Sequence, residues 1–136
     1  MARIDQLFDK LLELKGSDLH LGVDQPPMGR VRGQLVPLRD KELTRRELED
    51  LLFEITTDEQ QKTILGTWDL DFAYQYEKKA RFRANYFYMY TGIAAVFRTI
   101  PSTILSLDDL KTPEAVRKLS ERRAGLVLVT GPTGSG

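Results

Sequence analysis

The feature that most constrains this chain is an apolar segment that runs into a glycine-rich turn. Leu126 to Val129 are all apolar, and after Thr130 the sequence continues as Gly131, Pro132, Thr133, Gly134, Ser135 and Gly136. A continuous apolar run before turn residues is typical of a strand that is buried on both faces of a parallel sheet. The spacing G-x-x-x-x-G lets the backbone bend and bring its N–H groups towards phosphate oxygens. We therefore predict a strand followed by the first half of a phosphate-binding loop.

The second half of that motif is missing from the sequence. The motif requires Lys and then Ser or Thr after the second glycine, and Gly136 is the last residue. Those two residues supply the ammonium group for the β- and γ-phosphates and the hydroxyl group for Mg²⁺. We expect a nucleotide-binding loop in a parent protein of which this chain is a piece, and no hydrolysis by the chain alone.

Composition narrows the class of protein. The 136 residues can hold one domain of ordinary size and an appendage. Twenty basic and twenty acidic residues cancel, so the charge favours neither nucleic acid nor an anionic membrane as partner. Cysteine is absent, which excludes disulfides and thiolate metal sites and suits a reducing compartment. Because no segment resembles a signal peptide or a membrane span, we expect a cytoplasmic protein without direct membrane insertion and without a metal site.

Apolar residues that recur three and four positions apart predict the helices. The first helix covers residues 3–15, and Gly16 is expected at its end in a left-handed conformation. Two further helices start at capping boxes that begin at Thr44 and Thr57. The second of these two is expected to end at Gly66.

Alternation of apolar and polar residues predicts the strands. A hairpin is expected to turn at Gly33 and Gln34, and Pro101 is expected to end the sheet. The predicted strands are residues 17–23, 28–32, 35–38, 68–76, 80–90 and 93–100.

These elements divide the chain into three parts. Residues 1–100 form an α/β domain, of the α+β kind, with a mostly antiparallel sheet. Residues 101–123 form a connector with a short helix, which Thr112 caps and in which Pro113 takes the first position. Residues 124–136 contain the first strand and the partial loop of a second, truncated domain.

Arg83 and Arg98 are the strongest candidates for an anion-binding site within residues 1–100. If the two strands of residues 80–100 pair across a turn at Tyr90 and Thr91, Arg83 lies opposite Arg98 on the same face. Like charges that lie opposite each other destabilise a sheet, and a shared anion would offset this. Guanidinium geometry suits phosphate as that anion. The alternatives are two solvated arginines, or arginines paired with the aspartates of the neighbouring strand.

Other polar and aromatic groups fit structural roles better. His20 is the single histidine, and no nucleophile or metal-ligand cluster accompanies it, so we interpret it as structural. Asp69 and Asp71 share a strand face and could do acid–base chemistry, but a salt bridge to Arg81 or Arg83 is the favoured interpretation. The aromatic residues near the arginines could stack on bases, but zero net charge favours packing.

Several short segments occur together in the order and spacing of a known family. They are Gly16-Ser17-Asp18-Leu19-His20-Leu21, Arg81-Phe82-Arg83-Ala84-Asn85, Ala95-Val96-Phe97-Arg98-Thr99-Ile100-Pro101 and the run from Arg123 to Gly136. This arrangement resembles the type IV pilus retraction ATPases of the secretion superfamily of hexameric ATPases. The resemblance implies a PAS-like N-terminal domain at residues 1–100, joined by the connector to a RecA-like ATPase domain.

The resemblance also implies roles for individual residues. Arg83 and Arg98, with Arg81 a weaker candidate, would reach over ATP and stabilise the charge of its transferring phosphoryl group. The segment Gly131, Pro132, Thr133, Gly134, Ser135 and Gly136 would hold the phosphates. ATP and Mg²⁺ would be cofactors of the full-length protein only. A homo-hexamer, an inner-membrane pilus platform protein as partner, and a role in twitching motility are implied in the same way.

Two other functions remain open from the sequence. The PAS-like domain could be a non-catalytic sensor or adaptor that binds a small molecule or the platform protein. A pocket walled by Trp68, Phe72 and Tyr74 would favour that alternative. The domain could also serve assembly alone, by closing the ring against its neighbour.

Overall fold

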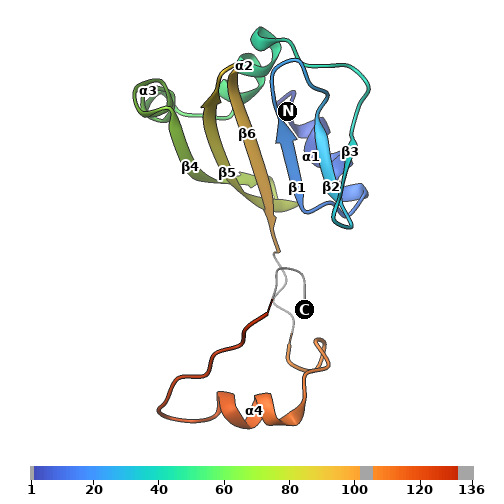
Figure 1. Cartoon of the computed structure of the whole chain (residues 1–136), viewed down its shortest axis with the longest axis vertical. Helices are drawn as coiled ribbons and strands as arrows, with labels where there is room; N and C mark the ends of the chain where they lie inside the picture. The colour runs from blue at the N-terminus through green and yellow to red at the C-terminus, as the bar shows by residue number, and fades with distance from the viewer. Residues whose placement is uncertain (1, 102–105, 132–136) are drawn as a thin grey trace. The chain divides into compact units, whose positions relative to one another are not determined.

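The computed structural model describes residues 2–101 and 106–131. The chain forms two compact units, Met1–Ser102 and Thr103–Gly136, and each is considered by itself (Figure 1). The first unit contains three helices and a six-stranded sheet, and the second contains a short helix.

The first unit is built on one sheet with the strand order β3-β2-β1-β6-β5-β4. Each pair of neighbouring strands is antiparallel. The predicted α/β class with a mostly antiparallel sheet is therefore confirmed. The strands are β1 (Asp18–Leu21), β2 (Met28–Val31), β3 (Gln34–Pro37), β4 (Asp69–Tyr76), β5 (Ala80–Met89) and β6 (Gly92–Ile100).

Helices α1 (Asp5–Glu13), α2 (Arg45–Phe53) and α3 (Asp58–Thr67) pack on one face of this sheet (Figure 1). Phe8 of α1 is fully buried. Its ring centroid lies 4.4 Å from that of Phe82 on β5 and 5.1 Å from that of Phe97 on β6. Because side chains alternate along a strand, the neighbours of these core residues point to the opposite face of the sheet. We call that opposite side the open face.

Both predicted capping boxes are confirmed. The Thr44 side chain accepts a hydrogen bond from the backbone N–H of Glu47 at 3.3 Å, and the Glu47 carboxylate accepts one from the backbone N–H of Thr44 at 3.0 Å. Thr57 and Gln60 make the same reciprocal pair at the start of α3. Each box satisfies N–H groups that the first turn of a helix leaves without partners.

The predicted helix ends need correction. Lys15, and not Gly16, has the left-handed conformation after α1, with φ of 53°. Gly16 is required for another reason, because a Cβ atom there would lie 2.5 Å from Leu11 Cδ1 and 3.2 Å from the Arg30 carbonyl oxygen. Similarly, α3 continues past the predicted stop at Gly66, and Trp68 takes the left-handed position with φ of 64°. The glycines at 16 and 66 thus lie next to or near the helix ends, but other residues take the left-handed conformation there.

The first hairpin turns one residue earlier than predicted. Arg32 and Gly33 join β2 to β3, with φ of 50° and 83°. A two-residue turn that matches the twist of the strands needs positive φ at both positions. The turn therefore lies at Arg32 and Gly33, and Gln34 already belongs to β3.

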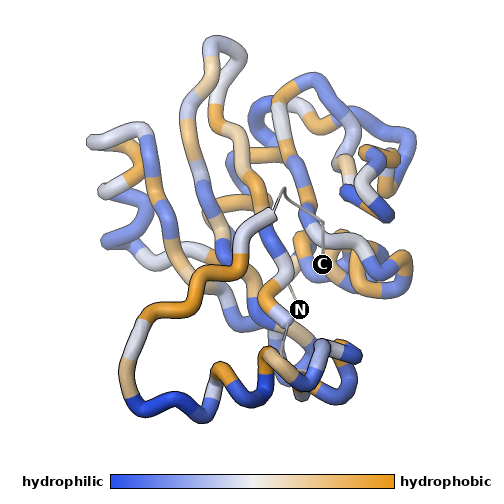
Figure 2. Tube along the Cα trace, turned by 60° about the horizontal axis from the view of Figure 1, so that its bottom comes forward, coloured by the Kyte–Doolittle hydropathy of each residue, from blue (hydrophilic) through white to orange (hydrophobic). Residues whose placement is uncertain are grey.

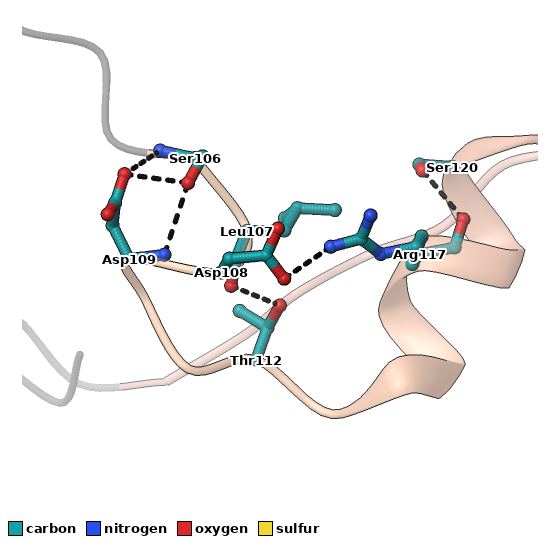
Figure 3. Close-up of polar contacts among 7 residues, drawn as sticks. All are labelled: Ser106, Leu107, Asp108, Asp109, Thr112, Arg117 and Ser120. Carbon is teal, nitrogen blue, oxygen red and sulfur yellow. Dashed lines mark hydrogen bonds and ion pairs between the residues drawn. The ribbon is translucent and has the colours of Figure 1, made fainter.

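In the second unit, hydrogen bonds fold the connector before helix α4 (Glu114–Ser120). Ser106 and Asp109 bond each other reciprocally, and Arg117 forms an ion pair with Asp108 (Figure 3). The Thr112 hydroxyl donates to the Leu107 carbonyl oxygen at 3.0 Å. Thr112 therefore does not cap α4 as predicted, and Pro113 occupies the cap position without a side-chain hydrogen bond.

The apolar segment Leu126 to Val129 does not form the predicted strand. Its side chains are between 53% and 87% exposed, and Figure 2 shows the segment as a continuous orange stretch. Val127, Leu128 and Val129 line a largely apolar hollow with Val116 and Leu119 of α4. A parallel strand needs backbone partners on neighbouring strands. Within residues 2–101 and 106–131, no strand pairs with this segment.

No helix in the described parts of the chain has the length and apolarity needed to cross a bilayer. The longest of these helices, α3, has 10 residues, whereas a bilayer-spanning helix needs about 20.

We predict that Tyr86→Phe destabilises the first unit. The buried Tyr86 hydroxyl donates to the Leu52 carbonyl oxygen at 3.1 Å, near the end of α2 where helix carbonyls lack partners. Its loss leaves a buried acceptor unsatisfied, so the free energy of unfolding should fall by about 1–3 kcal/mol. Urea denaturation measures this, with Tyr90→Phe as the control because Tyr90 is fully exposed. Equal stabilities of the two variants would contradict the prediction.

We also predict that Glu47→Gln reduces acid sensitivity. Hydrogen bonds from Lys41 and Thr44 lower the pKa of Glu47 from 4.5 to about 2. Because the folded-state pKa is the lower one, ionised Glu47 stabilises the fold above about pH 4.5, and this contribution disappears as pH falls towards 2. Gln preserves the capping geometry, as Gln60 shows in α3.

Urea midpoints between pH 2 and 6 test this prediction. The stability of Glu47→Gln should fall less steeply with acid than that of the unsubstituted chain. Glu42→Gln, at an exposed position of the preceding loop, should retain the original slope. If both variants follow the unsubstituted chain, the carboxylate of Glu47 does not contribute as described.

Candidate functional site

The β5–β6 hairpin brings the two predicted arginines together. Met89 pairs with Gly92 across the two-residue turn, and Arg83 pairs with Arg98 further along the same ladder. The predicted register is therefore confirmed. It follows from local sequence, because the turn between two adjacent strands fixes which residues lie opposite.

Both arginines project from the open face. On β5, Phe82 and Ala84 are buried against the helices, and the side chains between them are exposed. Arg83 and Arg98 retain 68% and 71% of their side-chain exposure. They line a shallow hollow of about 370 Å³ together with Asp71, Asn85 and Val96.

Arg83 is paired with a carboxylate of the edge strand. Its Nε lies 3.1 Å from both carboxylate oxygens of Asp71, and its Nη2 also donates to Oδ2. The hydrogen bond from Arg83 lowers the pKa of Asp71. Asn85, beside this pair, donates to Asp69 at 3.1 Å. Of the alternatives left open by the sequence, the pairing of an arginine with Asp71 is thus realised, in an exposed setting.

Arg98 is paired with a carboxylate that is far less exposed. Its Nε donates to Oδ1 of Asp18 at 2.9 Å, and the Asp18 side chain is only 6% exposed. Asp18 also accepts from the Ser17 hydroxyl at 2.7 Å and lies 3.5 Å from Nε of Arg30. Burial opposes ionisation of Asp18, but the hydrogen bonds from Ser17 and Arg98 outweigh it and lower the pKa of its carboxyl group.

Arg81 lies on the same face but in a different hollow. It pairs with Ile100 on one side and Gln75 on the other, two positions along the ladder from Arg83. The hollow around it, of about 240 Å³, is lined by residues 75, 78, 80, 81, 100 and 101. The structure therefore brings Arg83 and Arg98 together and leaves Arg81 beside them.

Sequence reasoning missed Asp18 and Arg30 as members of this site. Asp18 lies on β1, which pairs with β6 although the two are 80 residues apart in the chain. No local pattern specifies such a pairing. The alternation that places Asp18 on the same strand face as His20 was the available signal, but it did not show which strand would lie beside it.

His20 is half-buried between Val96 on β6 and Met28 on β2. Burial, followed by the charge of Arg30, lowers the pKa of the imidazole and favours its neutral form. Its Nε2 is buried and has no hydrogen-bond partner among the described residues. Residues 2–101 and 106–131 contain no group of three or more ligand side chains that could hold a metal ion.

Most of the predicted phosphate loop lies outside the described residues. Gly131 is exposed and belongs to no helix or strand. Pro132, Thr133, Gly134, Ser135 and Gly136 are not described, so their role in binding phosphate stays a prediction.

The three aromatic residues expected to wall a sensor pocket are either exposed or packed against other aromatic rings. Trp68 is 69% exposed. Phe72 packs edge-on against Tyr86, with ring centroids 5.2 Å apart. The ring centroid of Tyr74 lies 5.7 Å from that of Phe8. These contacts give Phe72 and Tyr74 a role in packing.

Comparison with known sequences identifies relatives of this chain. The chain is 42% identical over 120 residues to the type IV pilus retraction ATPase PilT of Pseudomonas aeruginosa, covering 88% of this chain and 35% of that protein. It is 44% identical over 110 residues to a twitching motility protein of Neisseria gonorrhoeae, covering 81% of this chain and 29% of the relative. The chain thus spans about a third of the length of these curated relatives. No family model matches it.

Comparison with solved structures agrees. The crystal structure of the pilus retraction motor PilT with bound ADP superposes with a TM-score of 0.82 and 33% identity, covering all of this chain and 40% of that one. The ATPase DotB of Legionella pneumophila gives a TM-score of 0.80 at 26% identity, covering 98% of this chain and 38% of that one. The chain therefore belongs to the PilT-type secretion ATPases, and its fold is that of their N-terminal domain.

Proposed function

We propose that this chain is the N-terminal region of a motor ATPase that drives type IV pilus retraction and twitching motility. In the proposal, Arg83 and Arg98 bind the terminal phosphates of ATP held on the loop from Gly131 to Gly136. The observation that carries it is the pair of exposed guanidinium groups that the β5–β6 register places opposite each other on the open face. The names of the relatives support the biological setting.

The chemistry of phosphoryl transfer explains why arginines suit this position. Negative charge spreads over the equatorial oxygens of the transferring phosphoryl group. A guanidinium group can donate two parallel hydrogen bonds to such oxygens and keeps its charge at any physiological pH. Arg83 and Arg98 would act together as arginine fingers, with Arg81 a weaker third candidate. ATP and Mg²⁺ would be the cofactors of the full-length protein.

The present ion pairs do not prevent this role. The pair of Arg83 with Asp71 lies at the surface, where water and salt screen it and its contribution to stability is small. A polyphosphate carries several negative charges and can replace Asp71 on Arg83. The Asp71 side chain is already 40% exposed in the ion pair, so water can solvate its carboxylate when Arg83 leaves. Arg98 contacts Asp18 through Nε, and among residues 2–101 and 106–131 no hydrogen bond occupies its terminal nitrogens, which can therefore donate to a ligand.

The assembled motor follows from the same proposal. The full-length protein would form a homo-hexamer at the cytoplasmic side of the inner membrane and would contact the pilus platform protein. Closure of the N-terminal domain onto nucleotide would couple hydrolysis to movement around the ring. The ADP bound to the similar PilT motor supports the use of nucleotide. The 136 residues do not include the Lys and the Ser or Thr of the loop motif, so they would not hydrolyse ATP by themselves.

We predict that Arg83→Ala and Arg98→Ala each lower turnover heavily in the full-length protein. Loss of an arginine finger costs about 10³-fold or more in kcat, because the charge of the transition state loses its partner. Phosphate release at saturating ATP measures kcat, and light scattering measures the size of the assembly, which should not change.

Arg46→Ala is the matched control. Arg46 is an exposed arginine of α2, on the side of the sheet that the helices occupy, so its removal should leave kcat unchanged. If Arg83→Ala and Arg98→Ala retain kcat values near that of Arg46→Ala, the two arginines are not fingers. A sensor or adaptor role for the domain would then be the better explanation.

A further inference from the structure

The open face carries one more arginine in the same row as Arg83 and Arg98. Arg83 pairs with Arg98 across β5 and β6, Arg98 with Asp18 across β6 and β1, and Asp18 with Arg30 across β1 and β2. Residues directly opposite each other in a sheet point to the same face. Three guanidinium groups and one carboxylate therefore lie in one line across four adjacent strands.

Asp18 holds the middle of this row. Its Oδ1 accepts from Arg98 Nε at 2.9 Å, and its Oδ2 accepts from the Ser17 hydroxyl at 2.7 Å and lies 3.5 Å from Arg30 Nε. With 6% exposure it is the least exposed charged side chain of the row. A carboxylate fixed in this way restricts the rotamers of both arginines that it contacts.

Arg30 is anchored from a second side. Its Nη1 donates to the Gly33 carbonyl oxygen at 3.1 Å, and Gly33 belongs to the turn between β2 and β3. Its side chain nevertheless retains 38% exposure. Within residues 2–101 and 106–131, Nη2 of Arg30 makes no hydrogen bond, so it can donate to a ligand.

The charges of the row favour an anion. Within the row, Arg30, Arg83 and Arg98 carry three positive charges and Asp18 carries one negative charge. Asp71, which meets Arg83 from β4, adds a second negative charge beside the row. A structural ion pair would need only one arginine for the buried carboxylate. The second arginine on Asp18 adds positive charge to the open face, where a polyphosphate is proposed to bind.

We infer that Arg30 is a third phosphate-binding arginine of this site, and that Asp18 is the positioning residue that holds Arg30 and Arg98 towards the ligand. This inference rests on the proposed function of Arg83 and Arg98. The ligand class is a polyphosphate, because it carries several negative charges and can accept hydrogen bonds from more than one guanidinium group.

The two carboxylates of the site should then respond oppositely to substitution. Asp71 is exposed and competes with the ligand for Arg83, so Asp71→Asn should strengthen binding. Asp18 is buried and orients its arginines, so Asp18→Asn should weaken binding even though it removes a negative charge. If Asp18 only neutralised its neighbours, its removal would strengthen binding as well.

Calorimetric titration of the 136-residue chain with inorganic tripolyphosphate at low salt tests the inference. Arg30→Gln and Asp18→Asn should each lower the affinity about tenfold, the effect of losing one hydrogen bond to a charged group. Asp71→Asn should raise the affinity a few-fold, and Arg46→Gln should leave it unchanged. Thermal denaturation of each variant shows that it is folded.

The outcomes separate the two proposals. If Arg83→Ala and Arg98→Ala bind tripolyphosphate as the unsubstituted chain does, the proposed function fails. If those two variants lose binding while Arg30→Gln retains it, or while folded Asp18→Asn binds more tightly, only the inference is overturned. Should Asp18→Asn fail to fold, Arg30→Gln alone decides, because a purely structural Arg30 would change the melting temperature without changing the affinity.

Discussion

The packing of Phe8 against the sheet determines which face of the sheet is buried and which face is open to water. Its ring lies against aromatic rings of β4, β5 and β6, so one face of those strands must be apolar and covered. Strict alternation then sends Arg83 and Arg98 to the other face, in contact with water. A register shift of one residue would bury both charges and expose Phe82 and Phe97. The hydrophobic core thus determines on which face of the sheet Arg83 and Arg98 lie.

The two carboxylates that pair with Arg83 and Arg98 differ in exposure to water, and they therefore respond differently to a ligand. Asp71 belongs to the edge strand β4 and can exchange its partner for a ligand at little cost in solvation. Asp18 lies in the middle of the sheet and would be left as a buried, unpaired charge if its arginines moved away. The partner of Arg83 is therefore exchangeable, whereas the partner of Arg98 and Arg30 is fixed.

The sequence indicated local features of this protein well. The two capping boxes and the β5–β6 register were predictable because each depends on residues that are close in the chain. The pairing of β1 with β6 was not, since the strands are distant in sequence and several arrangements would satisfy the same alternation. Asp18 and Arg30 were missed for this reason. The strand predicted at residues 126–129 needs neighbours that the described residues do not supply.

Gly16 links the two faces of the sheet. Because it has no Cβ, Leu11 of α1 and the carbonyl oxygen of Arg30 can both lie close to its Cα, and the backbone N–H of the next residue, Ser17, donates to that same carbonyl oxygen at 2.9 Å. A Cβ at this position would lie 2.5 Å from Leu11 Cδ1 and 3.2 Å from the Arg30 carbonyl oxygen, so the Leu11 side chain or the backbone before β1 would have to shift. A side chain here would therefore disturb both the packing beneath the sheet and the backbone that carries Arg30 and Asp18. One small residue thus couples the hydrophobic core to the geometry of the charges.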